Sequence, residues 1–343
     1  MEELQLHVIF GTGQVGPVLG RELKRQGHRV RLVSRRPNRA LGQGPVGPDS
    51  ASPPDGGGAP EPSRGWELMA ADATDPKAVD RACAGATTIY NCANPPYHRW
   101  RELLVPLFTA IRDGAERAEA KHVVLDNLYM YGRPPAESFD ERTPIAPCSM
   151  KGKLRAELHE ALFKAHTTGR IRAVSAHASD FFGPDAPRSL FSERFFHRLA
   201  RGKAVEVFGD PEFVHGYSYI PDVARGLAAI GTDDAALGRS WHLPVAWTKS
   251  TAELVAAFAK YAGVEPRMTR MSSGLLRLLG IVMPEARGIP EMLYQWEQPF
   301  LPSDQDFRKR FFPPTSADDA VRETATQALG LLTPPSGRSD ETP

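Results

Sequence analysis

The chain has 343 residues, with 42 lysines and arginines against 41 acidic residues and a formal net charge of +1. This balance does not favour nucleic acid or an anionic membrane as a partner, so a small-molecule substrate is expected, and a homodimer is left open. The three cysteines form no CxxC pair and no histidine cluster has metal-ligand spacing, which argues against a disulfide framework or a metal site. With no signal-peptide pattern and no apolar run of spanning length, a cytoplasmic protein is predicted.

Short apolar runs alternate with helical patterns through the first half of the chain. Such alternation predicts an α/β fold, here a Rossmann-type doubly wound parallel sheet covered by helices. Strands are predicted at 6–10, 29–34, 66–70, 87–92, 122–126 and 171–176, and helices at 15–27, 75–85, 102–118 and 153–166.

The pattern changes to shorter pieces after about residue 180. We expect a helix within 188–202, a strand pair from 204–209 and 216–220, and further helices at 221–231 and 248–263. The predicted organisation is a dinucleotide-binding domain over 1–180, a smaller mixed substrate-binding region over 181–330 interleaved with it, and a disordered tail over 331–343. Within the first domain, residues 41–65 are dominated by proline, glycine and serine and predict a flexible surface loop.

The first chemical motif is GTGQVG, which follows the first strand and opens a helix. Gly11 permits a tight turn, Gly13 allows the backbone to approach a pyrophosphate, and Gly16 allows close packing of helix on strand. The helix N-terminus, with Gln14 and Val15, supplies amide donors and a positive dipole. Because the motif has a strand before it and a helix after it, it predicts a dinucleotide-binding site rather than an ordinary glycine-rich turn.

The end of the second strand bears on which dinucleotide binds. NAD-specific sites usually present an acidic side chain there, whereas this chain has Ser34, Arg35 and Arg36. Guanidinium groups recognise phosphate through paired hydrogen bonds, so NADP(H) is favoured over NAD(H). The alternative is that these arginines merely form a solvated strand end.

Taken in order, several segments resemble those of the extended or atypical short-chain dehydrogenase/reductases, in the NAD-dependent epimerase/dehydratase group. The segments are ADATD, IYNCANPP, DNLYMYG, SDFFGP and HGYSYIPDVARGLAAI. The resemblance implies that Asp72 lies near the adenine and that Asn91 and Ala93 lie along the cofactor. It also implies a redox enzyme with a nicotinamide cofactor.

The same resemblance implies a departure at the active site. In the family, a tyrosine four residues before a lysine exchanges the proton, and a serine hydrogen-bonds the substrate oxygen. Here the lysine position is Lys153, but the tyrosine position is Ser149 and the serine position is Asn127. Serine is a poor acid and asparagine exchanges no proton, so Tyr129 is a candidate replacement. Ser149 has the alternative role of capping the helix that follows.

Four further residues are predicted near the substrate, and each has a structural alternative. They are Tyr97, His98, His177 and Asp180. The leading hypothesis is an NADPH-dependent, carbonyl reductase-like enzyme that acts on a small, hydrophobic substrate with an atypical proton donor. The alternatives are a non-catalytic NADP(H)-binding sensor or scaffold and a sugar-nucleotide epimerase or dehydratase.

Overall fold

The computed structural model describes residues 5–36, 66–136, 138–184, 186–274, 276 and 288–330. The predicted loop at 41–65 and the predicted tail at 331–343 therefore lie outside the described residues. The chain divides into two compact units, each built from several segments. The first unit comprises Met1–Asp126, Leu154–His177 and Ala224–Trp241, and the second comprises Asn127–Lys153, Ala178–Val223 and His242–Pro343.

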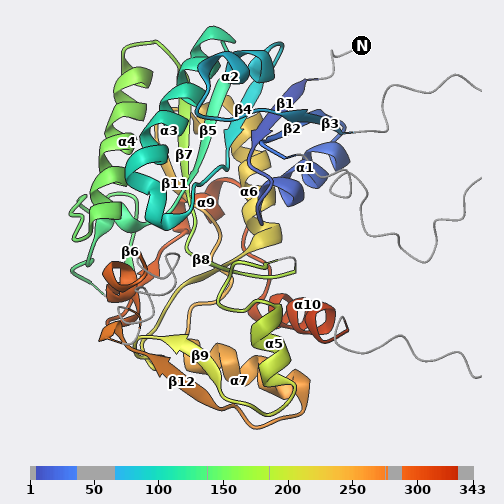
Figure 1. The fold of residues 1–343 in the computed structure, drawn as a ribbon, viewed down its shortest axis with the longest axis vertical. Coiled ribbons are helices and arrows are strands. Elements are labelled where there is room, and N and C mark those ends of the chain that lie inside the picture. Colours follow the sequence, from blue (N-terminus) through green and yellow to red (C-terminus); the bar gives the residue numbers. More distant parts are fainter. Residues whose placement is uncertain are drawn as a thin grey trace, which may run out of the picture. The chain divides into compact units, whose positions relative to one another are not determined.

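A seven-stranded sheet with the order β11-β7-β5-β4-β1-β2-β3 forms the centre of the first unit (Figure 1). The five pairings from β7 to β3 are all parallel, which confirms the predicted Rossmann-type fold. Phe10 lies beside both Val33 and Asn91, so β1, β2 and β4 end at one edge. The strands are β1 (Leu6–Phe10), β2 (Arg29–Ser34), β3 (Glu67–Ala70), β4 (Thr88–Asn91), β5 (Lys121–Asp126), β7 (Arg172–His177) and β11 (Ser240–His242).

The side chains of β1 point alternately to the two faces of the sheet, and each face packs against different helices. Val8 and Phe10 belong to the apolar core formed with α2 (Pro76–Cys83) and α3 (Trp100–Arg117). On the opposite face, the side chain of Ile9 approaches Gly16, the first residue of α1 (Gly16–Arg25). Successive side chains of a strand point to opposite faces, so one short apolar strand holds both helical layers.

The second unit contains three short parallel strand pairs. They are β8 (Asp180–Phe182) with β10 (Tyr217–Tyr219), β9 (Val205–Phe208) with β12 (Met268–Met271), and β6 (Ser138–Phe139) with β13 (Leu301–Pro302). The predicted pairing of 204–209 with 216–220 is therefore wrong, although both segments are strands. Each instead finds a partner distant in sequence, which local patterning does not reveal.

The helices predicted at 153–166, within 188–202, at 221–231 and at 248–263 correspond to α4 (Met150–Thr167), α5 (Glu193–Leu199), α6 (Ile220–Thr232) and α7 (Thr251–Ala262). The described residues also form α9 (Gln305–Arg310) and α10 (Ala317–Gly330), with short 3-10 helices η2 (Tyr97–Arg99), η3 (Tyr129–Tyr131), η4 (Asp234–Ala236) and η6 (Pro290–Trp296). Within the described residues, we find no helix with the length and hydrophobicity of a membrane span.

Candidate functional site

The glycine motif, residues 11–16, forms a loop at the carboxyl end of β1, which we call the glycine cradle. Gly11 has a φ of +110°, and a Cβ there would lie 2.7 Å from the carbonyl oxygen of Cys92. A Cβ at Gly16 would lie 1.9 Å from the carbonyl oxygen of Gly11, so this glycine permits the close approach of α1. A Cβ at Gly13, by contrast, would meet no described atom within 4 Å. Gly11 and Gly16 are therefore required by the fold, whereas Gly13 leaves open space beside an exposed backbone.

The first turn of α1 is suited to an anion. Val15 occupies the N-cap position, and no side chain within the described residues caps the helix. The first amides of a helix lack intrahelical partners, and the helix dipole adds positive charge there. Gln14 precedes this turn and is half-buried. The open space at Gly13 and the uncapped amides together fit the pyrophosphate of a dinucleotide.

The end of β2 carries the residues predicted to recognise a 2'-phosphate. Arg35 and Arg36 are exposed, whereas the hydroxyl of Ser34 is buried and makes no hydrogen bond within the described part of the chain. Asp72, after β3, accepts hydrogen bonds from the amide and hydroxyl of Thr74. These bonds lower the pKa of Asp72, and the nearby charge of Arg35 lowers it further. Arg35 and Asp72 therefore lie close together, at the edge where the nucleotide is expected.

The turn after β4 is stabilised by side chains that sequence reasoning only partly identified. The side chain of Asn91 is buried, and its oxygen accepts a hydrogen bond from the amide of Ala93 at 3.3 Å. Arg155 donates to the side-chain oxygen of Asn94 at 3.1 Å and pairs with Asp126 at 3.2 Å. Arg155 and Asp126 are both buried. Their ion pair therefore fixes the turn, a role that no local pattern indicated.

Ser149, at the position where the family resemblance expects tyrosine, caps α4. Its hydroxyl oxygen accepts a hydrogen bond from the amide of Gly152 at 3.0 Å, and the residue is 5% exposed. The adjacent amide of Met150 donates to a carboxylate oxygen of Glu291 at 2.9 Å. Two of the orphan amides of the helix are thus satisfied by side chains. The geometry gives Ser149 the capping role.

The two lysines near the start of α4 have different environments. Lys151 is 4% exposed, forms an ion pair with Glu291, and donates to the carbonyl oxygen of Gly288 at 3.0 Å. Lys153 is exposed. Its backbone amide makes the first helical hydrogen bond, to the carbonyl oxygen of Ser149 at 3.0 Å. Lys151 is therefore fixed in a structural contact, whereas the side chain of Lys153 is accessible to a ligand.

Asn127 and Tyr129 belong to the turn that packs against this helix. The side-chain oxygen of Asn127 accepts a hydrogen bond from the amide of Tyr129 at 3.1 Å, and Tyr129 is 8% exposed. A Cβ at Gly152 would lie 2.5 Å from the carbonyl oxygen of Tyr129. The glycine between the two lysines thus lets the first turn of α4 approach η3. Asn127, Tyr129, Ser149 and Lys153 all belong to the second unit.

The four predicted substrate residues lie in different environments. His98 is exposed, and Tyr97 packs edge-on against Trp100 at a ring separation of 5.1 Å. His177 is 1% exposed and is hydrogen-bonded to the hydroxyl of Ser175 at 3.0 Å, which is a structural arrangement. Asp180 contacts His215, whose significance the sequence did not indicate, at 2.7 Å.

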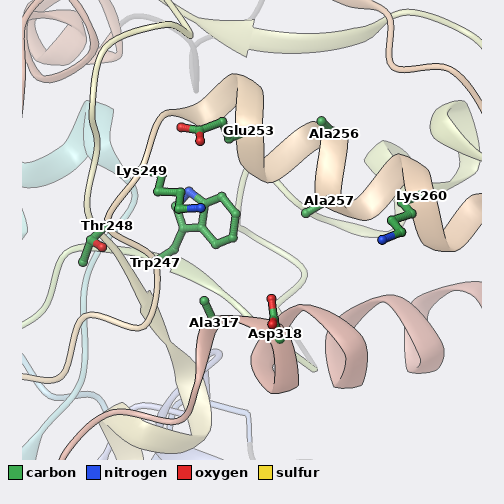
Figure 2. A pocket seen from close by; sticks show the side chains of 9 residues that line it. All are labelled: Trp247, Thr248, Lys249, Glu253, Ala256, Ala257, Lys260, Ala317 and Asp318. Atoms are coloured by element: carbon green, nitrogen blue, oxygen red, sulfur yellow. The ribbon is translucent and has the colours of Figure 1, made fainter.

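A separate hollow of about 420 Å³ lies on the second unit between α7 and α10 (Figure 2). Trp247 and Lys249 lie on one side of it, with Lys249 above the indole ring at 5.9 Å from its centre. Asp318 faces it from α10. None of the residues predicted to bind a cofactor or substrate lines this hollow, so it is not the candidate site.

Comparison with known proteins agrees with the fold. The model of the family described as "NAD dependent epimerase/dehydratase family" matches residues 8–243. A dTDP-glucose 4,6-dehydratase from Actinoplanes sp. is 28% identical over 143 residues, which is 41% of this chain and 43% of that enzyme. A second dTDP-glucose 4,6-dehydratase, from Neisseria gonorrhoeae, is 25% identical over 145 residues, or 41% of each chain. The matched segment thus spans less than half the length of these curated relatives.

Solved structures resemble the fold over almost the whole chain. A double mutant of the dTDP-glucose 4,6-dehydratase from Streptomyces venezuelae, with NAD bound, has a TM-score of 0.73 at 17% identity and covers 95% of this chain and 97% of its own. UDP-glucuronic acid 4-epimerase from Bacillus cereus, in complex with UDP-glucuronic acid and NAD, has a TM-score of 0.72 at 15% identity and covers 95% and 100%. The family model covers well over half of the sequence. The chain therefore belongs to the NAD dependent epimerase/dehydratase family.

Proposed function

We propose that this protein is an NAD(P)-dependent oxidoreductase of the epimerase/dehydratase type, acting on a hydroxyl-bearing carbon of a sugar nucleotide. The observation that carries the proposal is the cradle at the end of β1, where Gly13 leaves open space beside the uncapped first turn of α1. When bound there, the nicotinamide dinucleotide supplies reversible hydride transfer. Gly11, Gly13, Gly16, Asn91 and Ala93 would hold the dinucleotide, since they form the two turns at this edge.

The substrate class is drawn from the relatives. The two curated relatives are dTDP-glucose 4,6-dehydratases, and one structural neighbour was solved with UDP-glucuronic acid. These similarities favour a sugar-nucleotide epimerase or dehydratase over the carbonyl reductase-like enzyme that the sequence alone favoured. A small hydrophobic carbonyl compound stays the second substrate class to test. The cytoplasm stays the predicted compartment.

We further propose that NADP(H) is preferred to NAD(H). Exposed Arg35 and Arg36 and the unpaired buried hydroxyl of Ser34 support this choice, because no carboxylate at the end of β2 is placed to repel a 2'-phosphate. Asp72 lies near Arg35, and its negative charge opposes the binding of a 2'-phosphate. Two structural neighbours were solved with NAD, so the proposed preference rests on this chain's own residues alone.

Fluorescence titration with NADPH and NADH tests the cofactor assignment, and the Arg35→Ala variant tests its cause. Loss of that guanidinium should weaken NADPH binding by about tenfold, the cost of one charge-assisted hydrogen bond, and leave NADH binding unchanged. Lys24→Ala, a change in the last turn of α1, is the control for a general loss of positive charge. Equal or tighter binding of NADH by the wild type contradicts the NADP(H) preference.

The enzymatic reaction is tested with dTDP-glucose, UDP-glucose and UDP-glucuronic acid, each with oxidised and reduced dinucleotides. Formation of a keto sugar or an epimer, detected by mass spectrometry and NMR, is the expected result. The capping role of Ser149 supports one competing function, a dinucleotide-binding sensor without catalysis. A protein that binds the dinucleotide but converts neither these substrates nor a panel of simple ketones favours the sensor.

A further inference from the structure

The imidazole of His215 and the carboxylate of Asp180 form an acid–base contact in the second unit. Nε2 of His215 lies 2.7 Å from Oδ2 of Asp180, and Nδ1 lies 3.0 Å from the carbonyl oxygen of Gln295. The side chain of His215 is 1% exposed, whereas that of Asp180 is 32% exposed. The contact therefore has one member shielded from water and one that a ligand can reach.

The hydrogen-bond partners determine how many protons the pair holds. A carbonyl oxygen only accepts hydrogen bonds, so Nδ1 of His215 must carry a proton. The separation of 2.7 Å between Nε2 and Oδ2 requires a second proton, because a nitrogen lone pair facing a carboxylate would be repelled. This proton lies on Nε2, giving imidazolium and carboxylate, or on Oδ2, giving imidazole and carboxylic acid. In both forms the pair is neutral overall and holds one transferable proton.

Aromatic rings surround the imidazole. The ring of Trp296 is stacked on His215 at 4.9 Å with an interplanar angle of 9°, and the ring of Phe300 lies at 5.8 Å and 23°. The ring of Tyr217 lies at 4.7 Å, and its hydroxyl is bonded to Thr251. Aromatic faces stabilise a cation, and these rings exclude water from the imidazole. The route by which the proton can leave is the carboxyl group of Asp180.

The 3-10 helix η6 connects this pair with the start of α4. The carbonyl oxygen of Gln295, near the end of η6, accepts the hydrogen bond from Nδ1 of His215. Glu291, near the start of η6, accepts a hydrogen bond from the backbone amide of Met150, the residue that follows Ser149. Asp180 and His215 therefore lie in the same part of the second unit as the position where the family resemblance expects a tyrosine. Tyr294 lies between these two contacts on η6, and burial raises the pKa of its phenol.

We infer that Asp180, positioned by His215, is the proton donor and acceptor that takes the place of the missing tyrosine. In the reductive direction, a substrate carbonyl oxygen takes the shared proton from Asp180 while its carbon receives hydride from the reduced dinucleotide. One O–H and one C–H bond form, and the C=O double bond becomes single. In the oxidative direction, the hydroxyl proton returns to Asp180, and the hydrogen of the C–H bond leaves with its electron pair to the oxidised dinucleotide. This inference rests on the proposed function.

The protonation state of the pair is measured first, without any substrate. In protein labelled with ¹⁵N-histidine, the signals of His215 are assigned by their loss in the His215→Gln variant. Nδ1 should show the shift of a protonated nitrogen. Nε2 should show a protonated or intermediate shift if the shared proton lies on Nε2, and an unprotonated shift if it lies on Oδ2. In Asp180→Asn, the amide donates to Nε2, so Nε2 should be unprotonated. A wild-type Nδ1 without a proton contradicts the inference.

Turnover and chemical rescue provide the second measurement. Asp180→Ala should retain dinucleotide affinity and lose turnover by about 100- to 10,000-fold, the usual contribution of a general acid–base. Added formate should restore part of this turnover in a concentration-dependent manner, which a purely structural role of Asp180 would not produce. Glu206→Gln, which removes an exposed partner of Arg194, is the matched control and should keep full turnover.

The outcomes distinguish the two proposals. A wild type that converts none of the substrates contradicts the proposed function, whatever the NMR result shows. An active wild type together with a fully active Asp180→Ala contradicts the role of Asp180 alone. Tyr294→Phe is the remaining comparison: if it loses turnover while Asp180→Ala does not, the buried phenol is the proton donor and the inference is overturned.

Discussion

The hydroxyl oxygen of Ser149 accepts a hydrogen bond from the backbone amide of Gly152 at 3.0 Å, and this contact begins α4. Replacement of Ser149 by alanine should lower the free energy of unfolding by about 1 kcal/mol, the usual cost of losing an N-cap. Turnover should fall by less than about threefold, because the hydroxyl is a cap and not an acid. Urea unfolding and steady-state kinetics measure the two effects. A variant with unchanged stability and no turnover would mean that Ser149 does the chemistry.

Lys153 and Lys151 should respond to substitution in opposite ways. Lys153→Met removes an exposed ammonium group, and we expect dinucleotide affinity to fall by about tenfold or more with little change in stability. Lys151→Met breaks the ion pair with Glu291 and should cost about 2–3 kcal/mol, less than for a fully buried pair because Glu291 is partly exposed. Affinity titration and thermal unfolding of both variants provide the measurement. Equal losses of dinucleotide affinity in the two variants would contradict the different roles assigned to Lys153 and Lys151.

Gly13 and Gly11 allow binding to be separated from folding. Gly13→Ala adds a methyl group into space that no described atom occupies, so the protein should fold normally and bind the dinucleotide about tenfold more weakly. Gly11→Ala places a side chain at a φ of +110° and against a carbonyl oxygen, and should destabilise the fold by about 1–3 kcal/mol. Calorimetric titration and thermal unfolding distinguish these cases. Unaltered affinity in Gly13→Ala would show that the cradle does not face the ligand.

His122 should make the fold sensitive to acid. It is completely buried, both its ring nitrogens lack hydrogen bonds within the described part of the chain, and burial lowers its pKa to about 3. The folded protein keeps this imidazole neutral, whereas the unfolded chain protonates it below about pH 6.5. The stability that depends on the neutral form is therefore complete above about pH 6.5 and is lost as the pH falls from there towards about 3.

The variant His122→Leu tests this dependence. It should raise the free energy of unfolding by about 1 kcal/mol at neutral pH, because two unpaired polar atoms are removed, and by more near about pH 5. The variant His7→Leu serves as the comparison for His122→Leu. Burial also lowers the pKa of His7 to about 3, but Nδ1 of His7 is bonded to the hydroxyl of Tyr90 at 3.0 Å, so that within the described part of the chain His7 has one unpaired ring nitrogen and His122 has two. His7→Leu should therefore lose stability at neutral pH. Identical responses of the two variants would contradict the role of the unpaired nitrogens.

The sheet and the cradle could be predicted because their determinants are local. Six strands of the sheet, β1 to β5 and β7, are short apolar runs that end at a turn, whereas β11 was not predicted. The spacing of Gly11, Gly13 and Gly16 directly reflects which backbone atoms must approach one another. The pairing of β9 with β12 could not be predicted, because the two strands are some sixty residues apart and neither turn chemistry nor periodicity connects them.

The environment of the site residues depended on long-range contacts and was less predictable. The family resemblance placed Lys153 at the lysine position, but the contact that makes Lys151 structural, with Glu291 140 residues away, could not be predicted from the sequence. In the sequence, His215 is only a polar residue before a strand. Its role could not be predicted because its partners Asp180 and Gln295 come from separate segments. The sequence therefore indicated where a proton donor was missing, whereas the candidate replacement required three-dimensional contacts.

The central claim is that this chain performs nicotinamide-dependent redox chemistry on a sugar nucleotide. The most direct measurement is a single-turnover experiment with the protein in excess, following the near-ultraviolet absorbance of the reduced nicotinamide while dTDP-glucose or UDP-glucuronic acid is added to the complex with oxidised dinucleotide. We predict a rise in absorbance that requires the sugar nucleotide and is lost in Lys153→Met. A tightly bound dinucleotide whose absorbance stays constant with every sugar nucleotide would contradict the claim.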